Sequence, residues 1–153
     1  IVIFEIVAVK IKTFDYFFFS IGGYFDGYNV LIMQNDHFEI IKGGYNHLNK
    51  YPEPTTELDQ NLKRELIAVL NEIQVTKWEK TYDSEVLDGT QWELEIKYND
   101  RKTNKLVFGS NEYPYVKDAE NGIILSKTLN PKPDFVKLLT ILNKIVGKRN
   151  FFY

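Results

Sequence analysis

The clearest pattern in this sequence is a strict alternation of apolar and polar residues over positions 91–98. Side chains on a β-strand point alternately to its two faces, so this pattern predicts a strand with one buried and one solvated face. Such strands are typical of antiparallel sheets that have one face in water. A polar turn over residues 99–104 and a short apolar run over 105–108 predict a hairpin that ends at Gly109. The side chains predicted to point into the core are Trp92, Leu94, Ile96 and Tyr98.

Apolar runs earlier in the chain predict further strands. Residues 14–21 form a run that is apolar on both faces. Such a strand is central in its sheet, or its outer face meets a partner. Residues 28–34 and 37–42 flank Asn35-Asp36, and this arrangement predicts a β-hairpin.

Apolar residues at steps of three and four predict an amphipathic helix in the middle of the chain. The stripe begins near Leu58 and ends at Ile73. Thr56 with Asp59 three residues later is a variant of the capping box, so the helix is expected to start at Thr55–Thr56. We expect its polar face to be solvated and its apolar stripe to pack on the sheet.

A second helix is predicted over residues 135–146, with Asp134 as its N-cap and Gly147 as its C-terminal stop. The chain then ends in the aromatic residues 151–153, which we expect to dock on the domain. Between the last hairpin and this helix, Asn121-Gly122 predicts one more small hairpin.

Together these elements predict an α+β fold. The economical packing has two layers, in which a mostly antiparallel sheet of about five to seven strands carries both helices on one face. The chain has 153 residues, the usual size of one domain, so residues 1–153 are expected to form a single domain.

Composition argues against several classes of protein. The chain has no cysteine, which excludes a disulfide scaffold and cysteine-based zinc sites. Its net charge of −2 argues against general nucleic-acid binding, which needs a basic face. No run reaches the ~20 apolar residues of a membrane span, and residues 1–9 are expected to form a strand rather than a signal peptide. No Asn-X-Ser/Thr sequence occurs, which favours a cytoplasmic protein.

Few residues point to catalysis or to a bound metal. His37 and His47 are expected at the start of a strand and in a loop, where a surface or hydrogen-bonded role is favoured over metal ligation or base catalysis. There is no G-x-S-x-G motif and no cysteine nucleophile. We therefore predict no catalytic residue, no metal and no cofactor.

Four carboxylates lie close together in the sequence before the strand predicted over residues 91–98. They do not match the calcium-loop pattern, which favours a solvated acidic loop. The alternatives are a weak cation site and an acidic surface that binds a basic partner. The four residues are Glu79, Asp83, Glu85 and Asp88.

A glycine-rich segment over residues 21–28 carries three large aromatic side chains, those of Tyr24, Phe25 and Tyr28. The segment does not match G-x-G-x-x-G and no helix pattern follows it, so no phosphate-binding loop is predicted. Large rings on a loop are covered by the domain's own core, by a protein partner or by a small ligand. Because Tyr is enriched at protein interfaces, these rings and the four carboxylates form our predicted protein-binding surface.

The second half of the chain has a recognisable spacing of aromatic, apolar and turn residues. The residues that form it are Trp78, Tyr82, Asp88-Gly89, Trp92, Leu94, Ile96, Tyr98, Gly109, Asn111 and Tyr113-Pro114. In this half, and more weakly over residues 17–27, the chain resembles a group of small proteins from bacteria and their mobile elements. The resemblance departs after Pro114, where an additional segment precedes the last helix, and it implies no activity.

The sequence therefore favours a non-catalytic protein-binding domain over an enzyme. The most concrete form of this hypothesis is a phage or mobile-element inhibitor of a host defence protein. The alternatives are a small carboxylate- or His-based hydrolase and a binder of a small apolar ligand. The sequence does not determine the oligomeric state.

Overall fold

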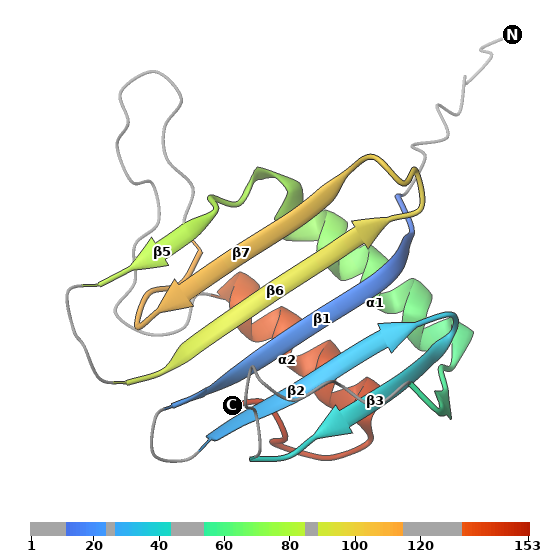
Figure 1. Ribbon diagram of the computed structural model, residues 1–153, viewed down its shortest axis with the longest axis horizontal. Helices are drawn as coiled ribbons and strands as arrows, with labels where there is room; N and C mark the ends of the chain where they lie inside the picture. Colours follow the sequence, from blue (N-terminus) through green and yellow to red (C-terminus); the bar gives the residue numbers. More distant parts are fainter. Residues whose placement is uncertain (1–11, 24–26, 44–53, 85–88, 115–132) are drawn as a thin grey trace, which may run out of the picture.

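Antiparallel pairings between long strands form the centre of a seven-stranded sheet with the order β4-β3-β2-β1-β6-β7-β5 (Figure 1). The computed structural model describes residues 12–23, 27–43, 54–84, 89–114 and 133–153. The strands are β1 (Phe14–Gly23), β2 (Gly27–Gln34), β3 (His37–Ile41), β4 (Thr56–Glu57), β5 (Thr81–Asp83), β6 (Gln91–Tyr98) and β7 (Asn104–Ser110).

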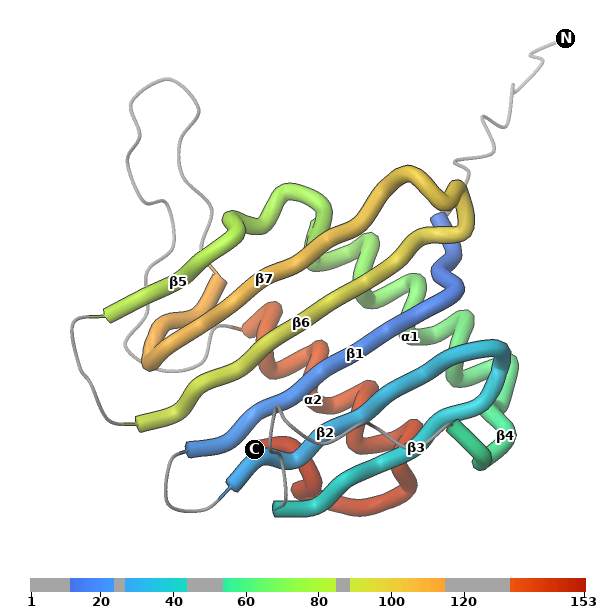
Figure 2. Tube along the Cα trace, in the orientation of Figure 1, coloured from blue at the N-terminus to red at the C-terminus, as the bar shows by residue number. Residues whose placement is uncertain are grey.

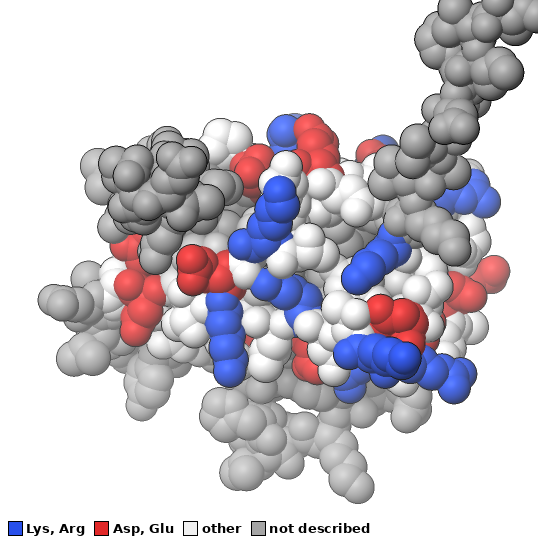
Figure 3. Space-filling model, turned by 90° about the horizontal axis from the view of Figure 1, so that it is seen from above, with Lys and Arg blue, Asp and Glu red and all other residues white. Residues whose placement is uncertain are grey.

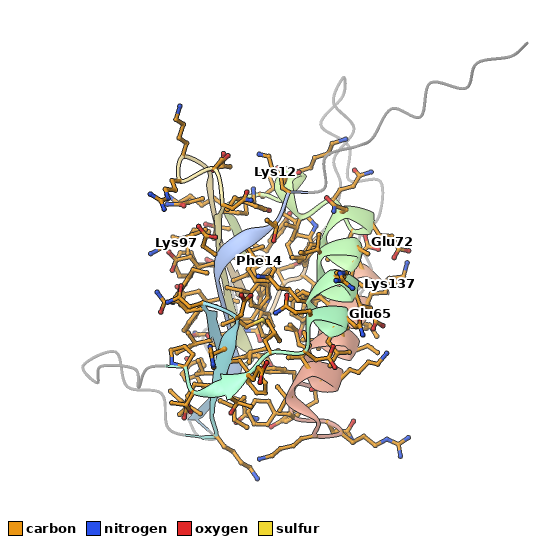
Figure 4. The ribbon with its side chains drawn as sticks, turned by 90° about the vertical axis from the view of Figure 1, so that its right-hand side faces the viewer. Lys12, Phe14, Glu65, Glu72, Lys97 and Lys137 are labelled. Carbon is orange, nitrogen blue, oxygen red and sulfur yellow. The ribbon has the colours of Figure 1, made fainter. Side chains whose placement is uncertain are left out.

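Two helices lie side by side on one face of this sheet (Figures 1 and 4). The helical segments are α1 (Gln60–Glu72), the short 3-10 helix η1 (Val75–Lys77) and α2 (Pro133–Val146). The predicted fold class is therefore confirmed: the protein is an α+β fold with a mostly antiparallel sheet and both helices on one side. None of the helices in the described residues is long and apolar enough to cross a membrane.

The hairpin predicted around Asn35-Asp36 is present between β2 and β3. Both turn residues adopt positive φ, 52° for Asn35 and 61° for Asp36. Two consecutive residues with positive φ match the twist of antiparallel strands, and Asn and Asp tolerate this conformation. Lys63 on α1 donates to the Asp36 carboxylate at 3.0 Å. This bond is the main reason that the pKa of Asp36 is lowered, and it ties the turn to the helical layer.

The start of α1 differs from our prediction. Thr56 belongs to β4, which pairs with β3, and the helix begins at Gln60 (Figure 2). Asp59 is the N-cap, and its side chain accepts hydrogen bonds from the backbone N–H groups of Asn61 and Leu62. An aspartate with extended backbone caps a helix as well as a threonine does. The Thr56 hydroxyl was therefore the wrong choice of cap.

The predicted acidic loop over residues 79–88 is not wholly a loop. Its middle forms β5, which pairs in parallel with β7 at the edge of the sheet. The Lys80 carbonyl accepts a hydrogen bond from Phe108 N, and Ser84 N donates to the Ser110 carbonyl. These bonds extend the ladder on both sides of β5.

The second helix starts at Pro133, a residue favoured at the first helical position. Asp134 therefore lies in the first turn and is not the N-cap that we predicted. The stop at Gly147 is confirmed, since this residue has φ +74° and its N–H reaches the Asn143 carbonyl at 3.0 Å. The docking of the aromatic tail is confirmed for Phe151 and Phe152, which are buried.

The core lies between the sheet and the helices, and large rings fill it. Trp92 is 2% exposed, and its ring packs on those of Trp78, Tyr82 and Phe135 at centroid distances of 6.1, 6.3 and 4.9 Å. The three other residues predicted to point inward from this strand are also buried. The alternation in the sequence therefore predicted the covered face of β6 correctly.

Two predicted elements, the strand over residues 1–9 and the hairpin around Asn121-Gly122, lie outside the described residues.

Candidate functional site

The face of the sheet turned away from α1 and α2, here the outer face, gathers side chains from six strands. Partners in an antiparallel register point to the same side of the sheet, so the pairing fixes which residues share this face. Lys97, for example, lies on the opposite side of the sheet from the helices (Figure 4). The outer face includes Tyr16, Phe18, Ser20, Tyr28, Val30, Ile32, Glu39, Ile41, Thr81, Asp83, Gln91, Glu93, Glu95, Lys97, Leu106, Phe108 and Ser110.

One part of the outer face is apolar. Phe18, Val30 and Ile32 are at most 4% exposed and form a cluster separate from the main core. Among the described residues, the partly buried side chains of Tyr16, Tyr28 and Ile41 pack against it. The prediction that residues 14–21 are apolar on both faces is thus explained: β1 is a central strand, and it contributes to a cluster on each side of the sheet.

Next to this cluster lies a groove with a volume of about 330 Å³. It crosses the ends of β1, β6 and β7 and reaches β5 at the edge of the sheet. The residues lining it are Ser20, Tyr28, Thr81, Tyr82, Asp83, Gln91, Trp92, Glu93, Phe108, Gly109 and Ser110.

The groove is hollow because small residues lie between larger ones. Ser20 pairs with Val30 on one side and with Glu93 on the other, and Glu93 pairs with Phe108. The serine is only 3% exposed, whereas Phe108 is 40% exposed. The short side chain of Ser20 lies between larger neighbours, and the Phe108 ring projects beyond Glu93, which leaves a depression on this face.

On the side of the groove opposite Phe108, a hydrogen bond holds the side chain of Tyr28 in place. The Tyr28 hydroxyl on β2 donates to the Gln91 Oε1 atom on β6 at 2.9 Å. The bond crosses over β1, because Gly22 pairs with both Tyr28 and Gln91 and has no side chain between them. Tyr28 is therefore held in a fixed position at the groove.

At the groove, the Trp92 ring of β6 packs directly against the backbone of β7 at Gly109. A Cβ atom on Gly109, its partner on β7, would lie 1.9 Å from the indole nitrogen. Only glycine fits there, and the indole N–H donates to the Glu112 carbonyl at 2.9 Å. The groove is therefore built on a rigid part of the sheet.

Two carboxylates lie in the groove. Asp83 comes from β5 and pairs with Ser110, while Glu93 comes from β6. On the same face Glu95 lies 3.9 Å from the Lys97 ammonium. Acidic side chains thus accompany aromatic rings along this part of the sheet.

The structure brings together two of the residues predicted for the interface from separate stretches of sequence. Tyr28 and Asp83 line the same groove. Glu79 is exposed and lies outside the groove, and its backbone N–H donates to the Tyr82 hydroxyl at 2.8 Å. The remaining predicted interface residues, Tyr24, Phe25, Glu85 and Asp88, lie outside the described residues.

Several residues of the groove were missed by the sequence analysis. Gln91 and Glu93 were assigned correctly to the polar face of their strand, but only the register shows which strands flank them. Phe108 carries a weak signal in the sequence, because it follows Val107 in an apolar run and must point to the opposite face. Ser20 carries none.

No group of three or more His, Cys, Asp or Glu side chains that could hold a metal ion occurs within the described residues. The His37 ring is exposed, and its Nδ1 atom lies 2.8 Å from the Asn35 carbonyl oxygen. Its position at the start of a strand is as predicted, whereas His47 lies outside the described residues.

A lysine with a lowered pKa, Lys105, lies outside the groove. Burial lowers the pKa of Lys105, and the nearby Glu79 partly offsets this effect. The Lys105 ammonium donates to the backbone carbonyl of Trp78, which follows η1. Its partner Ile96 faces the helices, so Lys105 acts as a tie within the covered side of the sheet.

Positive and negative side chains are mixed on the side of the molecule that is at the top in Figure 1. Lys and Arg lie among Asp and Glu in the described part of this view, without a large area of one sign (Figure 3).

Comparison with known proteins gave no match: no protein-family model, no curated protein and no solved structure is similar to this chain.

Proposed function

We propose that this chain is a non-catalytic protein-binding domain and that the outer face of its sheet is the interface. The observation that carries the proposal is a groove on the sheet face opposite α1 and α2, which has the exposed ring of Phe108 in its wall and a second apolar cluster beside it. Interfaces combine aromatic anchors with polar groups in this way.

The shape of the outer face favours a protein over a small apolar ligand. Small-molecule sites usually enclose about 300–1,000 Å³ and are mostly apolar. The groove, at about 330 Å³, is at the small end of that range, and its walls include Asp83, Gln91 and Glu93. The partly buried side chains around the adjoining cluster, those of Tyr16, Tyr28 and Ile41, extend the surface across β1, β2 and β3, which suits a large partner.

The chemistry of the groove suits a partner that presents a basic side chain beside an apolar one. Asp83 and Glu93 supply negative charge, and the exposed ring of Phe108 offers a surface for an aliphatic stem. Lys and Arg side chains combine a charged head with such a stem. A host defence protein inhibited by a phage or mobile element remains the most concrete partner in this proposal, on the basis of the sequence resemblance.

A hydrolase is the second candidate, because Asp83 and Glu93 come from different strands and share one groove. Paired carboxylates can provide a general acid and a general base. Asp83→Asn and Glu93→Gln variants distinguish the two functions. A hydrolytic activity of the wild-type protein that either variant abolishes would favour the enzyme.

A comparison of three baits tests the proposal. Wild-type protein, Phe108→Glu and Val136→Glu are immobilised and exposed to lysate of the host cell. Both substitutions place a glutamate at an exposed apolar position, but Val136 lies on α2, on the other side of the molecule. We expect a stoichiometric protein on the wild-type and Val136→Glu baits that is lost from the Phe108→Glu bait. Equal capture by all three baits would contradict the proposal.

A further inference from the structure

The outer surface of the helical layer carries regularly spaced ion pairs between α1 and α2. Lys137 donates to Glu72 at 2.8 Å and Lys144 to Glu65 at 3.0 Å. Each helix thus contributes two charges seven residues apart, acidic on α1 and basic on α2. The later glutamate of α1, Glu72, pairs with the earlier lysine of α2, Lys137, so the two helices are antiparallel. Glu65, Glu72 and Lys137 project from the side of the helices remote from the sheet (Figure 4).

Between the two ion pairs lies an apolar groove with a volume of about 390 Å³. Val69 of α1 faces Val136, Thr140 and Ile141 of α2 across it. Val136 is 46% exposed, one of the most exposed large apolar side chains among the described residues. The Thr140 hydroxyl donates to the Val136 carbonyl at 2.8 Å, so this polar group is already satisfied inside the helix.

We propose that this surface is the interface of a homodimer whose two-fold axis runs parallel to α1 and α2. Rotation about such an axis places α1 of one copy over α2 of the other at the same height along the helices. The acidic row of each copy then faces the basic row of its partner, and Val136 of each copy lies over α1 of the other near the height of Glu72. The surface is therefore complementary to itself, as an isologous interface requires.

The same charges exclude the other simple arrangement. A two-fold axis perpendicular to the helices would place α1 over α1 and α2 over α2. Glutamates would then face glutamates, and lysines would face lysines. Like charges placed opposite one another oppose association, so the charge pattern selects one axis.

The surface between the helices is small for a stable dimer. The helices have 13 and 14 residues, which corresponds to a length of about 20 Å. Two helices packed about 10 Å apart present a face that is smaller than the roughly 800 Å² per partner of a standard interface. The dimer is therefore weak, and because exposed ion pairs are screened, added salt dissociates it. Both outer faces of the sheets point away from this dimer, so each copy keeps its proposed partner surface.

A charge-swap series tests the proposal by analytical ultracentrifugation of the full chain up to millimolar concentration. Glu65→Lys with Glu72→Lys makes both helices basic and should raise the dimer dissociation constant at least about tenfold. Adding Lys137→Glu and Lys144→Glu restores the intramolecular pairs with reversed polarity and should restore the dimer. The fully swapped protein should not form mixed dimers with wild type, because acidic rows then face acidic rows. A monomeric wild type at all concentrations, or free mixing of wild-type and swapped chains, would overturn the proposal.

A matched pair of variants separates this interface from the proposed function. Val136→Glu should abolish the dimer and leave partner capture intact, whereas Phe108→Glu should do the reverse. Circular dichroism of both variants shows that the fold is kept. A dimer that survives Val136→Glu with its affinity unchanged would contradict this interface, even if partner capture behaves as expected.

Discussion

The two faces of the sheet use the same strands for different purposes. On the covered face, Phe17 and Phe19 of β1 are fully buried against the helices and the C-terminal tail. The side chain between them, Phe18, points to the outer face and joins a separate cluster, whose other buried members among the described residues are Val30 and Ile32. Both faces are therefore apolar near the centre of β1. They differ in what adjoins that centre: an aromatic core on one side, and a groove with carboxylates on the other.

This difference shows that an apolar strand pattern does not by itself indicate stability or binding. The covered face gains from close packing of rings, where each lost contact leaves a cavity. The outer face carries exposed rings such as Phe108, whose removal leaves no cavity. Substitutions in the core on the first face should therefore destabilise the protein, and substitutions of exposed residues such as Phe108 on the second should change what it binds.

The largest effect is expected for Trp92→Ala on the covered face. The change removes the ring contacts with Trp78, Tyr82 and Phe135 and the hydrogen bond to the Glu112 carbonyl. We expect a loss of at least ~3 kcal/mol in the free energy of unfolding, measured by urea denaturation. A loss below ~1 kcal/mol would mean that the two faces have been assigned the wrong way round.

A smaller effect is expected for Gly109→Ala, which adds a methyl group on the covered side. The new Cβ atom would lie 1.9 Å from the Trp92 indole nitrogen, so the ring or the strand must move. Overpacking of this kind costs ~1–3 kcal/mol. The matched control is the same substitution combined with Trp92→Ala, where the added cost of the methyl group should largely vanish. Equal costs in both backgrounds would rule out the clash.

The start of the helical layer provides the next test. Asp59→Ala removes the side chain that caps α1 and should cost ~1 kcal/mol of stability in thermal or urea unfolding. Thr56→Ala alters an exposed residue of β4 and should change stability by no more than ~0.5 kcal/mol. A larger loss of stability for Thr56→Ala than for Asp59→Ala would show that Thr56 caps the helix.

The smallest effect concerns pH. Burial raises the pKa of Tyr98 on the covered face above its usual 10.0. As pH rises, the unfolded chain therefore loses this proton before the folded chain does, so stability falls from about pH 10 upward. Tyr98→Phe removes this contribution and should make the alkaline loss of unfolding free energy less steep. Identical slopes for the two proteins would show that the hydroxyl is not desolvated.

The fold could be predicted further than the site, for a physical reason. Alternation along residues 91–98 and the Asn35-Asp36 turn are local signals, and both were confirmed. The start of α1 was missed because Thr56 and Asp59 are both good caps, and the choice between them depends on the pairing of β4 with β3. That pairing is a tertiary contact that the local sequence does not encode.

The groove depends almost entirely on such long-range pairing. Tyr28 and Asp83 were each predicted to contact a partner, but nothing in the sequence places them together. Their proximity follows from the strand order, in which β1, β6 and β7 lie between β2 and β5. Ser20 became part of the groove only because Val30 and Glu93 are its neighbours across the strands.

The most direct test of the account compares two phenylalanines on opposite faces, Phe19→Ala and Phe108→Ala. For each variant, urea denaturation gives the free energy of unfolding, and calorimetry at a temperature where both are folded gives the affinity for the captured partner. We predict that Phe19→Ala loses ~3 kcal/mol or more of stability and keeps its affinity. Phe108→Ala should lose less than ~1 kcal/mol of stability and ~2 kcal/mol or more of binding free energy. If the affinity of the Phe108→Ala variant is unchanged, the outer face is not the interface and the central claim fails.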